Sequence, residues 1–315
     1  MTLGQRLREG DRSAAPAALN VIEDRSPAGR ERARELLAEV APAKLGGEAH
    51  AHLVGVTGPP GAGKSSLLSA LVKQWRDDGR TVAVLAVDPS SKRSGGSLLG
   101  DRARIEHDPR DDGVLIRSTA AGGRLGGLAP ATREAAQALA PAYDVVVVET
   151  VGVGQSETDV EELCDTTAVV VQPASGDTLQ FLKAGIMEVP DVLVVTKADL
   201  GDVARRARRD LIAALRSLGS PGTPVVSVSS VPPPAGIEDL AAALDEHRAG
   251  LDLPSVRARS RRLAALADFA AEHGEAGVRE LGGRREAERF LAALDPALDM
   301  SSLVTALMAR KGSGA

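Results

Sequence analysis

A glycine-rich stretch between residues 53 and 68 holds the residues best suited to chemistry. It reads LVGVTGPPGAGKSSLL, with four residues between Gly58 and Gly63 and then Lys64 and Ser65, the spacing of a phosphate-binding loop. Glycines let backbone N–H groups converge on phosphate oxygens, and the N-terminus of a following helix adds partial positive charge. Lys64 is expected to reach the β- and γ-phosphates, and the Ser65 hydroxyl to ligate Mg²⁺. The stretch predicts a nucleoside triphosphate site, with phosphate contacts from Gly58, Pro59, Pro60, Gly61, Ala62, Gly63, Lys64, Ser65 and Ser66.

Three acidic residues follow apolar or glycine-rich stretches farther along the chain. Asp88 ends one apolar run, and Glu149 ends the run Val-Val-Val-Val-Glu. A carboxylate in such a place holds Mg²⁺ or its waters in many nucleotide sites. Asp101 lies in the glycine-rich segment 95–102, which we interpret as a switch segment with Asp101 facing the metal directly or through water. The expected metal ligands are therefore Ser65, Asp88, Asp101 and Glu149.

Glu149 also begins a four-residue pattern, Glu-Thr-Val-Gly, which is similar to the D-x-x-G switch of GTPases with Glu in place of Asp. The N–H of Gly152 would then bond the γ-phosphate and register its loss. Val153 follows Gly152, where a water-positioning glutamine usually stands. Gln155, or Glu149 acting through water, is the candidate for that role beside Lys64. We therefore expect hydrolysis to be slow without a partner.

The segment Thr196-Lys-Ala-Asp199 is similar to the guanine-recognition motif N-K-x-D, with Thr in place of Asn. In that motif the acid accepts two hydrogen bonds from guanine and the lysine packs along the ring, so the acid rejects adenine. A second short loop after the next apolar run would contact the guanine oxygen. The expected base-site residues are Thr196, Lys197, Asp199, Ser229, Ser230 and Val231.

Strands and helices alternate from residue 53 onward. The expected strands are continuous runs of Val, Leu and Ala, which indicates burial on both faces and hence a doubly wound, mostly parallel α/β sheet. Such sheets bind ligands at the carboxyl ends of their strands. The strands are expected at 53–57, 81–88, 114–117, 144–150, 168–173, 192–196 and 224–229. Helices are expected at 65–77, 132–140, 178–187, 203–218 and 237–246.

The two ends of the chain lack this alternation. Residues 1–50 have helical spacing of apolar residues, and residues 251–315 include a helix with Leu266 and Phe269 on one apolar face. That face could hold a partner subunit or simply cap its own domain. We expect a helical N-terminal extension over 1–50, a nucleotide domain over 51–250 and a C-terminal helical arm over 251–315.

Composition narrows the class of protein. The 315 residues carry a net charge of −5 without a long basic block, which argues against nucleic acid as a partner. One cysteine, Cys164, excludes a disulfide framework and is typical of a reducing compartment. No apolar run reaches the length that spans a membrane. We expect a cytoplasmic protein without a membrane partner.

Together these motifs resemble the P-loop GTPases that serve metallo- and cobalamin enzymes, and most closely the MeaB and ArgK-like proteins. The most specific segments are 83–91, 95–102, 149–157 and 185–188. The resemblance implies a GTPase that assists a B12-dependent acyl-CoA mutase of the methylmalonyl-CoA mutase type in adenosylcobalamin loading, protection and reactivation. It also implies docking on that mutase or on a cobalamin adenosyltransferase, and a homodimer held partly by terminal helical arms.

Two other functions fit parts of the pattern. A metal-insertion GTPase would need a Cys/His ligand set, for which the chain offers only the close pair His50 and His52. We interpret that pair as the ordinary approach to a strand. A transport-linked P-loop ATPase, or a nucleotide-gated scaffold without hydrolysis, is the other alternative.

Overall fold

The structure is a computed structural model of residues 1–315, and it describes all of them except 89–104, 121–127, 151–155, 174–189 and 314–315. The chain forms two compact units. The sheet unit comprises residues 52–132 and 143–250, and the helical unit comprises residues 1–51, 133–142 and 251–315. The three segments expected from the sequence stay a prediction about how the protein divides functionally.

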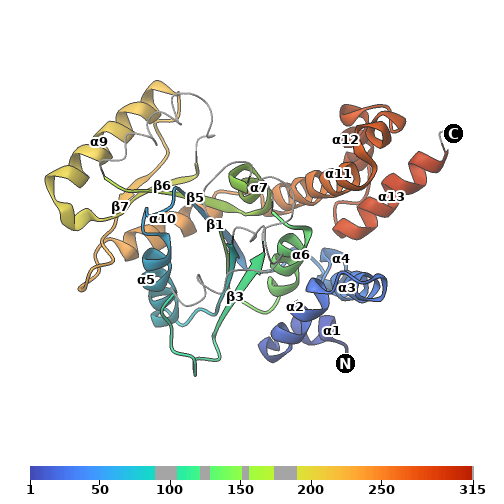
Figure 1. Cartoon of the computed structure of the whole chain (residues 1–315), viewed down its shortest axis with the longest axis horizontal. Helices are drawn as coiled ribbons and strands as arrows, with labels where there is room; N and C mark the ends of the chain where they lie inside the picture. The colour runs from blue at the N-terminus through green and yellow to red at the C-terminus, as the bar shows by residue number, and fades with distance from the viewer. Residues whose placement is uncertain (89–104, 121–127, 151–155, 174–189, 314–315) are drawn as a thin grey trace, which may run out of the picture. The chain divides into compact units, whose positions relative to one another are not determined.

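The sheet unit is built on seven parallel strands in the order β3-β2-β4-β1-β5-β6-β7 (Figure 1). The expected doubly wound α/β class is confirmed. Each strand end lies within three residues of its predicted position. The strands are β1 His52–Thr57, β2 Val82–Asp88, β3 Val114–Ala120, β4 Val145–Glu149, β5 Thr166–Val171, β6 Val192–Val195 and β7 Val225–Ser227.

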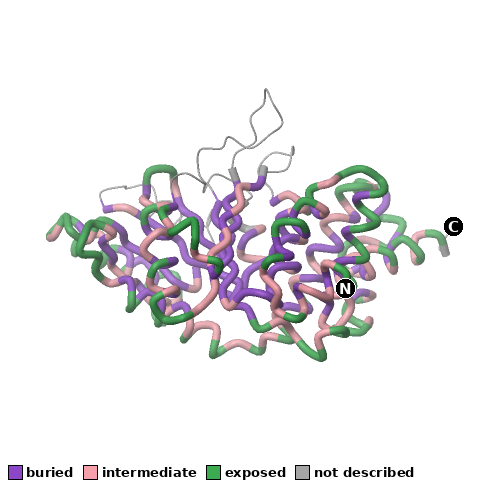
Figure 2. The backbone as a smooth tube through the Cα atoms, turned by 90° about the horizontal axis from the view of Figure 1, so that it is seen from below, coloured by how far each residue is buried: buried purple, intermediate pink, exposed green. Residues whose placement is uncertain are grey.

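Alternate residues of these strands enter two different apolar clusters. On β5, Ala168 and Val170 pack in one cluster with leucines of α5 and α10. Val169 and Val171 pack in the other cluster with Leu211 of α9. Because successive strand residues point to opposite faces, helices cover the sheet on both sides. Every residue of β1, β4, β5 and β6 is buried, and Figure 2 draws buried residues in purple.

Four of the expected helices are present with ends within three residues of the predicted ones, and α7 (Ser156–Leu163) is a helix that was not expected. The helix expected over 178–187 lies outside the described residues. Helix α6, Pro130–Leu139, contributes its first residues to the sheet unit and the rest to the helical unit. The others are α5 Lys64–Asp77, α7 Ser156–Leu163, the short η3 Ala198–Leu200, α9 Asp202–Ser217 and α10 Ile237–Ala249.

The helical unit buries the apolar face that the sequence places on its longest helix. Leu266 and Phe269 of α11 lie in one cluster with Leu291 and Leu303, so this face packs inside its own unit. In the described residues, no helix combines the length and the apolar character needed to cross a membrane. The elements are α1 Leu3–Arg8, η1 Arg12–Ala14, α2 Ala15–Glu23, α3 Pro27–Glu39, α4 Pro42–Leu45, α11 Leu253–Glu280, α12 Arg284–Ala292 and α13 Met300–Ser313.

Candidate nucleotide-binding site

The glycine loop joins β1 to α5 at the carboxyl edge of the sheet. Gly58 has φ 140°, and a Cβ there would lie 2.1 Å from the carbonyl oxygen of Val170 on β5. No side chain fits in that space, so the loop can pass this close to β5 only with glycine at position 58. Gly63 caps α5 in the left-handed conformation, with φ 91°. These two glycines set the path by which the loop turns into the helix.

Lys64 is the first residue of α5, and its side chain folds back over the loop. Its Nζ donates to the carbonyl oxygens of Gly58, at 2.6 Å, and Pro59, at 3.2 Å. The lysine is 7% exposed. The structure thus places a buried ammonium group against the loop at the N-terminus of a 14-residue helix. Both features attract phosphate oxygens. Ser65 and Ser66 follow in the first turn, half-buried and exposed respectively.

Glu149 lies at the same edge as the loop. It is the last residue of β4, a strand that pairs on one side with β1 and on the other with β2. Its register partners are Val56 on β1 and Ala86 on β2, and its side chain is buried. The next residue, Thr150, donates its hydroxyl to the Thr57 hydroxyl at 3.0 Å. That bond ties the end of β4 to the residue before the loop.

Of the remaining expected metal and switch residues, the structure describes only the backbone of one. Asp88 ends β2, opposite Ala120 of β3, and so its backbone lies at the carboxyl edge with Glu149. Asp101, Gly152 and Gln155 lie outside the described residues. The structure therefore brings two of the sequence-predicted carboxylate positions, 88 and 149, to the edge that carries the loop.

Thr196 braces the phosphate loop. Its buried hydroxyl lies 2.6 Å from the carbonyl oxygen of Ala62 and 3.0 Å from that of Val171. A hydroxyl has one proton to donate, so the two carbonyls share it. Lys197, with φ 54°, lies beside the same loop: its Nζ donates to the Gln172 side chain at 2.6 Å and to the Gly61 carbonyl at 3.4 Å.

Asp199 lies exposed at the end of this motif, and a second loop holds it. Its Oδ1 accepts a hydrogen bond from the Ser229 hydroxyl at 2.8 Å. The N–H of Ala198 also donates to the carbonyl of Val228 at 3.0 Å. The structure therefore brings the two segments predicted to form the base site together. Ser230 is half-buried and Val231 is exposed at the tip of the second loop.

A cavity of about 830 Å³ opens beside these segments and runs along the outer face of α5. Its lining includes Ser66, two residues after Lys64, and Ser230 of the second loop. The lining also includes charged residues of both signs: Lys73, Arg76, Asp77, Glu106, Asp108 and Asp111.

Several supporting contacts have no signal in the sequence. The carbonyl oxygen of Val170 lies against Gly58, and that of Val171 accepts a hydrogen bond from the Thr196 hydroxyl. In the sequence both valines have the pattern of ordinary strand residues. Gln172, which receives Lys197, stands out only as a polar residue directly after an apolar strand. A search for polar residues at every strand end would have found Gln172, but not the backbone carbonyls.

Comparison with known proteins decides the family. The family described as "Methylmalonyl Co-A mutase-associated GTPase MeaB" matches residues 15–275. The chain belongs to the MeaB family. The match spans both units, so the MeaB assignment does not depend on the phosphate loop alone.

Curated relatives agree with the MeaB assignment. A protein named as a probable GTPase of Mycobacterium bovis is 41% identical over 256 residues, covering 78% of this chain and 74% of the relative. A protein of Caenorhabditis elegans named as a mitochondrial methylmalonic aciduria type A homolog is 41% identical over 221 residues, covering 67% of this chain and 55% of its own length. A putative GTPase of Pyrococcus abyssi is 47% identical over 196 residues, and the match spans 58% of that protein's length.

A solved structure shares the fold. The crystal structure titled as a LAO/AO transport system kinase superposes with a TM-score of 0.67 at 28% identity. The match covers 98% of this chain and 95% of that one. The expected resemblance to MeaB and ArgK-like P-loop proteins is thereby confirmed at the level of family and fold.

Proposed function

We propose that this MeaB-family chain binds GTP with Mg²⁺, hydrolyses it slowly to GDP and phosphate, and uses that cycle to assist a B12-dependent acyl-CoA mutase. The observation that supports a nucleotide ligand is the hydrogen-bonded connection between the two predicted motifs. Thr196 bonds the phosphate loop at Ala62, and Asp199 is oriented by Ser229. A base motif fixed to a phosphate loop in this way suits one ligand that carries both a base and phosphates.

In this proposal the loop from Gly58 to Ser66 holds the phosphates. Its backbone N–H groups and Lys64 supply positive charge on one side of them. The donors available to Mg²⁺ are the Ser65 hydroxyl and the carboxylates of Asp88, Asp101 and Glu149. These are oxygen ligands, the kind that Mg²⁺ prefers, and the buried position of Glu149 beside β1 supports the assignment. Mg²⁺, when bound, would neutralise charge on the phosphate oxygens.

The base would be chosen by Asp199, with Lys197 along the ring and Ser229, Ser230 and Val231 around the guanine oxygen. Thr196 takes another role, because its hydroxyl is directed to the loop carbonyl of Ala62. Replacement of the usual Asn by Thr at 196 therefore leaves guanine selection to Asp199. For hydrolysis, Lys64 would stabilise the developing charge, and Gln155 or Glu149 would orient the attacking water.

The experiment that tests base recognition compares Asp199→Asn with Asp202→Asn. Asp202 lies nearby, is exposed and pairs with Arg205. Exchanging the carboxylate for an amide at 199 replaces an acceptor by a donor, so the variant should lose GTP affinity and gain affinity for xanthosine triphosphate. The control should bind GTP as the wild type does. Equal competition by GTP in wild type and Asp199→Asn would remove Asp199 from base recognition.

The proposed partner is a mutase of the methylmalonyl-CoA mutase type, with a cobalamin adenosyltransferase as the second candidate. The printed family description and the name of the C. elegans relative support the mutase. We also propose a homodimer that acts in the cytoplasm. A pull-down from native extract with a non-hydrolysable GTP analogue should recover the mutase. A Lys64→Ala bait that recovers as much mutase would show that nucleotide does not control the interaction.

The alternative of a transport-linked ATPase has one point in its favour, the printed title of the similar crystal structure. Phosphate release with GTP and with ATP separates the two functions, because Asp199 is expected to reject adenine. A turnover with ATP equal to that with GTP would favour the alternative.

A further inference from the structure

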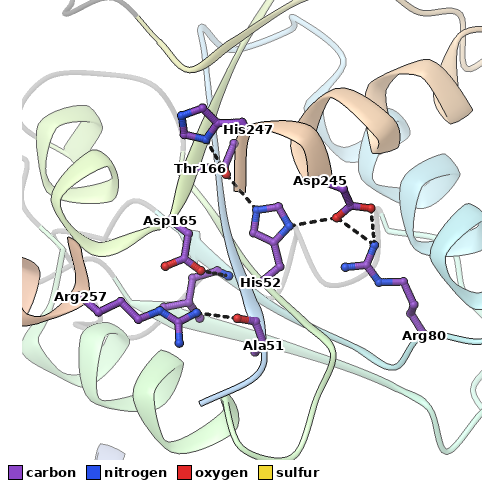
Figure 3. Close-up of polar contacts among 9 residues, drawn as sticks. Ala51, His52, Arg80, Asp165, Thr166, Asp245, His247 and Arg257 are labelled. Carbon is purple, nitrogen blue, oxygen red and sulfur yellow. Dashed lines mark hydrogen bonds and ion pairs between the residues drawn. The ribbon is translucent and has the colours of Figure 1, made fainter. Parts of the chain in front are cut away.

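A chain of polar side chains lies at the amino edge of the sheet, opposite the nucleotide site (Figure 3). His52, the first residue of β1, directs Nδ1 to Asp245 at 3.3 Å and Nε2 to the Thr166 hydroxyl at 2.9 Å. The same hydroxyl lies 2.9 Å from Nδ1 of His247. His247 Nε2 lies 3.1 Å from Asp191. Two imidazoles thus share one hydroxyl, and each has a carboxylate on its other side.

Hydrogen-bond donors and acceptors fix the number of protons in this chain. Each carboxylate accepts only, so the ring nitrogen that faces it must carry a proton. The Thr166 hydroxyl can donate to one imidazole, and it must accept from the other. One imidazole therefore carries protons on both nitrogens, and the other carries one. All four contacts are satisfied only when the pair holds one proton more than two neutral rings.

Burial indicates which ring carries the extra proton. The His52 side chain is 1% exposed, and burial lowers its pKa. The His247 side chain is 26% exposed and lies in the last turn of α10, where the helix dipole favours positive charge. The lower-energy arrangement therefore has His52 protonated at Nδ1, Thr166 donating to His52, and His247 donating to both Thr166 and Asp191.

The neighbouring charged residues are compatible with this protonation of His52 and His247. Arg80 donates to both oxygens of Asp245, at 3.1 and 2.8 Å, and keeps it an acceptor. Asp165, beside His52, accepts from the N–H of Leu53, and Arg248 of α10 opposes a positive charge on His52. Asp191 also accepts from the N–H of Thr167, and Asp144, at the start of β4, is bonded to Thr81.

We propose that His52, Thr166 and His247 form a proton-dependent lock that joins the last turn of α10 to the first residues of β1 and β5. His52 is the first residue of the sheet unit and α10 ends one residue before Gly250, its last, so the lock fixes the two ends of this unit. A second added proton would charge buried His52 and leave the Thr166 hydroxyl proton without an acceptor. Loss of the extra proton would leave one of the four contacts without a proton between its two atoms.

The first test reads the protons directly. A pH series of nitrogen NMR spectra of the full chain with ¹⁵N-labelled histidine, assigned with His52→Gln and His247→Gln, should show that the first proton added to the pair makes His247 protonated at both nitrogens while His52 stays protonated at Nδ1 only. Addition of that proton to His52, or protonation of His52 at Nε2, would overturn the proposal. This measurement uses the wild-type protein, so it does not depend on whether a variant folds.

The second test compares Thr166→Val with Thr167→Val. The two threonines are adjacent on β5 and both are buried, but the Thr167 hydroxyl has no hydrogen-bond partner among the described residues. Amide exchange of residues 245–250, corrected for intrinsic rates, should lose about tenfold in protection in Thr166→Val at pH 7. Thr167→Val should exchange as the wild type does. Equal losses in both variants would assign the effect to packing and refute the lock.

Discussion

The two edges of the same sheet differ in what their polar groups bind. At the carboxyl edge, donors of the Gly58 loop and of the start of α5, and the acceptor of the exposed Asp199, are available to the proposed ligand. At the amino edge, His52, Thr166 and their carboxylates satisfy one another. The difference teaches that charged residues alone do not mark a binding site. What distinguishes the carboxyl edge is a backbone held open by glycines, with a cation directed into it.

Among the variants that separate the two edges, Lys64→Ala should have the largest effect. It removes the buried cation at the carboxyl edge and changes nothing at the amino edge. We expect the affinity for GTP to fall by about 10²–10³-fold, with little change in the midpoint of thermal unfolding. Isothermal titration calorimetry and differential scanning calorimetry measure the two quantities. Lys44→Ala is the control, since Lys44 is exposed on α4 of the helical unit and is not part of the candidate site. Wild-type GTP affinity in Lys64→Ala would contradict the assignment of the site.

Thr196→Val should have a smaller effect, because the residue acts on the ligand through the loop. Loss of the bond to the Ala62 carbonyl should speed nucleotide release by about tenfold. The preference for GTP over inosine triphosphate should stay as it is in the wild type. Thr196→Ser keeps the hydroxyl and should release nucleotide at close to the wild-type rate. Stopped-flow release of labelled GDP checks the rates, and a changed base preference would place Thr196 at the base.

Acid should have the smallest effect, a small loss of folding stability that arises at the amino edge. Burial lowers the pKa of His52, and the bonds from His52 and Arg80 lower the pKa of Asp245. As pH falls below about 6.5 the unfolded chain binds a proton that buried His52 does not take up. Folding stability should therefore decrease with falling pH, and further near pH 4 as Asp245 becomes protonated in the unfolded chain.

Glu134 in the helical unit has the opposite effect on stability as the pH falls, so replacing Glu134 should make the loss of stability at the amino edge easier to measure. Burial raises the pKa of Glu134 to about 7. Its contribution to stability is complete below pH 4.5 and is lost as pH rises toward 7. In Glu134→Gln, urea unfolding between pH 7 and 5 should show a steeper loss of stability than in the wild type. An equal slope in the two proteins would contradict the raised pKa.

The sequence predicted the ligand edge better than the rest. The spacing from Gly58 to Ser65 and the position of Glu149 after four valines placed them at strand ends, since a parallel sheet gathers all its carboxyl ends at one edge. The sequence pattern predicted the apolar face of α11, but it did not predict which residues this face contacts. Whether Leu266 and Phe269 meet another subunit or α12 and α13 depends on contacts between helices far apart along the chain.

The role of Thr196 shows why the rest could not be predicted. In the guanine-recognition motif Thr196 replaces the usual Asn, which by itself predicts weaker guanine recognition. In the structure it supports the loop through the carbonyls of Ala62 and Val171. No spacing rule encodes a backbone carbonyl, because every residue has one.

The sequence by itself determined the family and the parallel sheet, and it predicted a nucleotide ligand, because glycine spacing and valine runs are local constraints on backbone and burial. Only the tertiary structure decided which residues support the site, and it alone joined His52, Thr166 and His247. Those three side chains are far apart in sequence. They meet because parallel pairing of β1 with β5, and the packing of α10 against both, bring their ends to one edge.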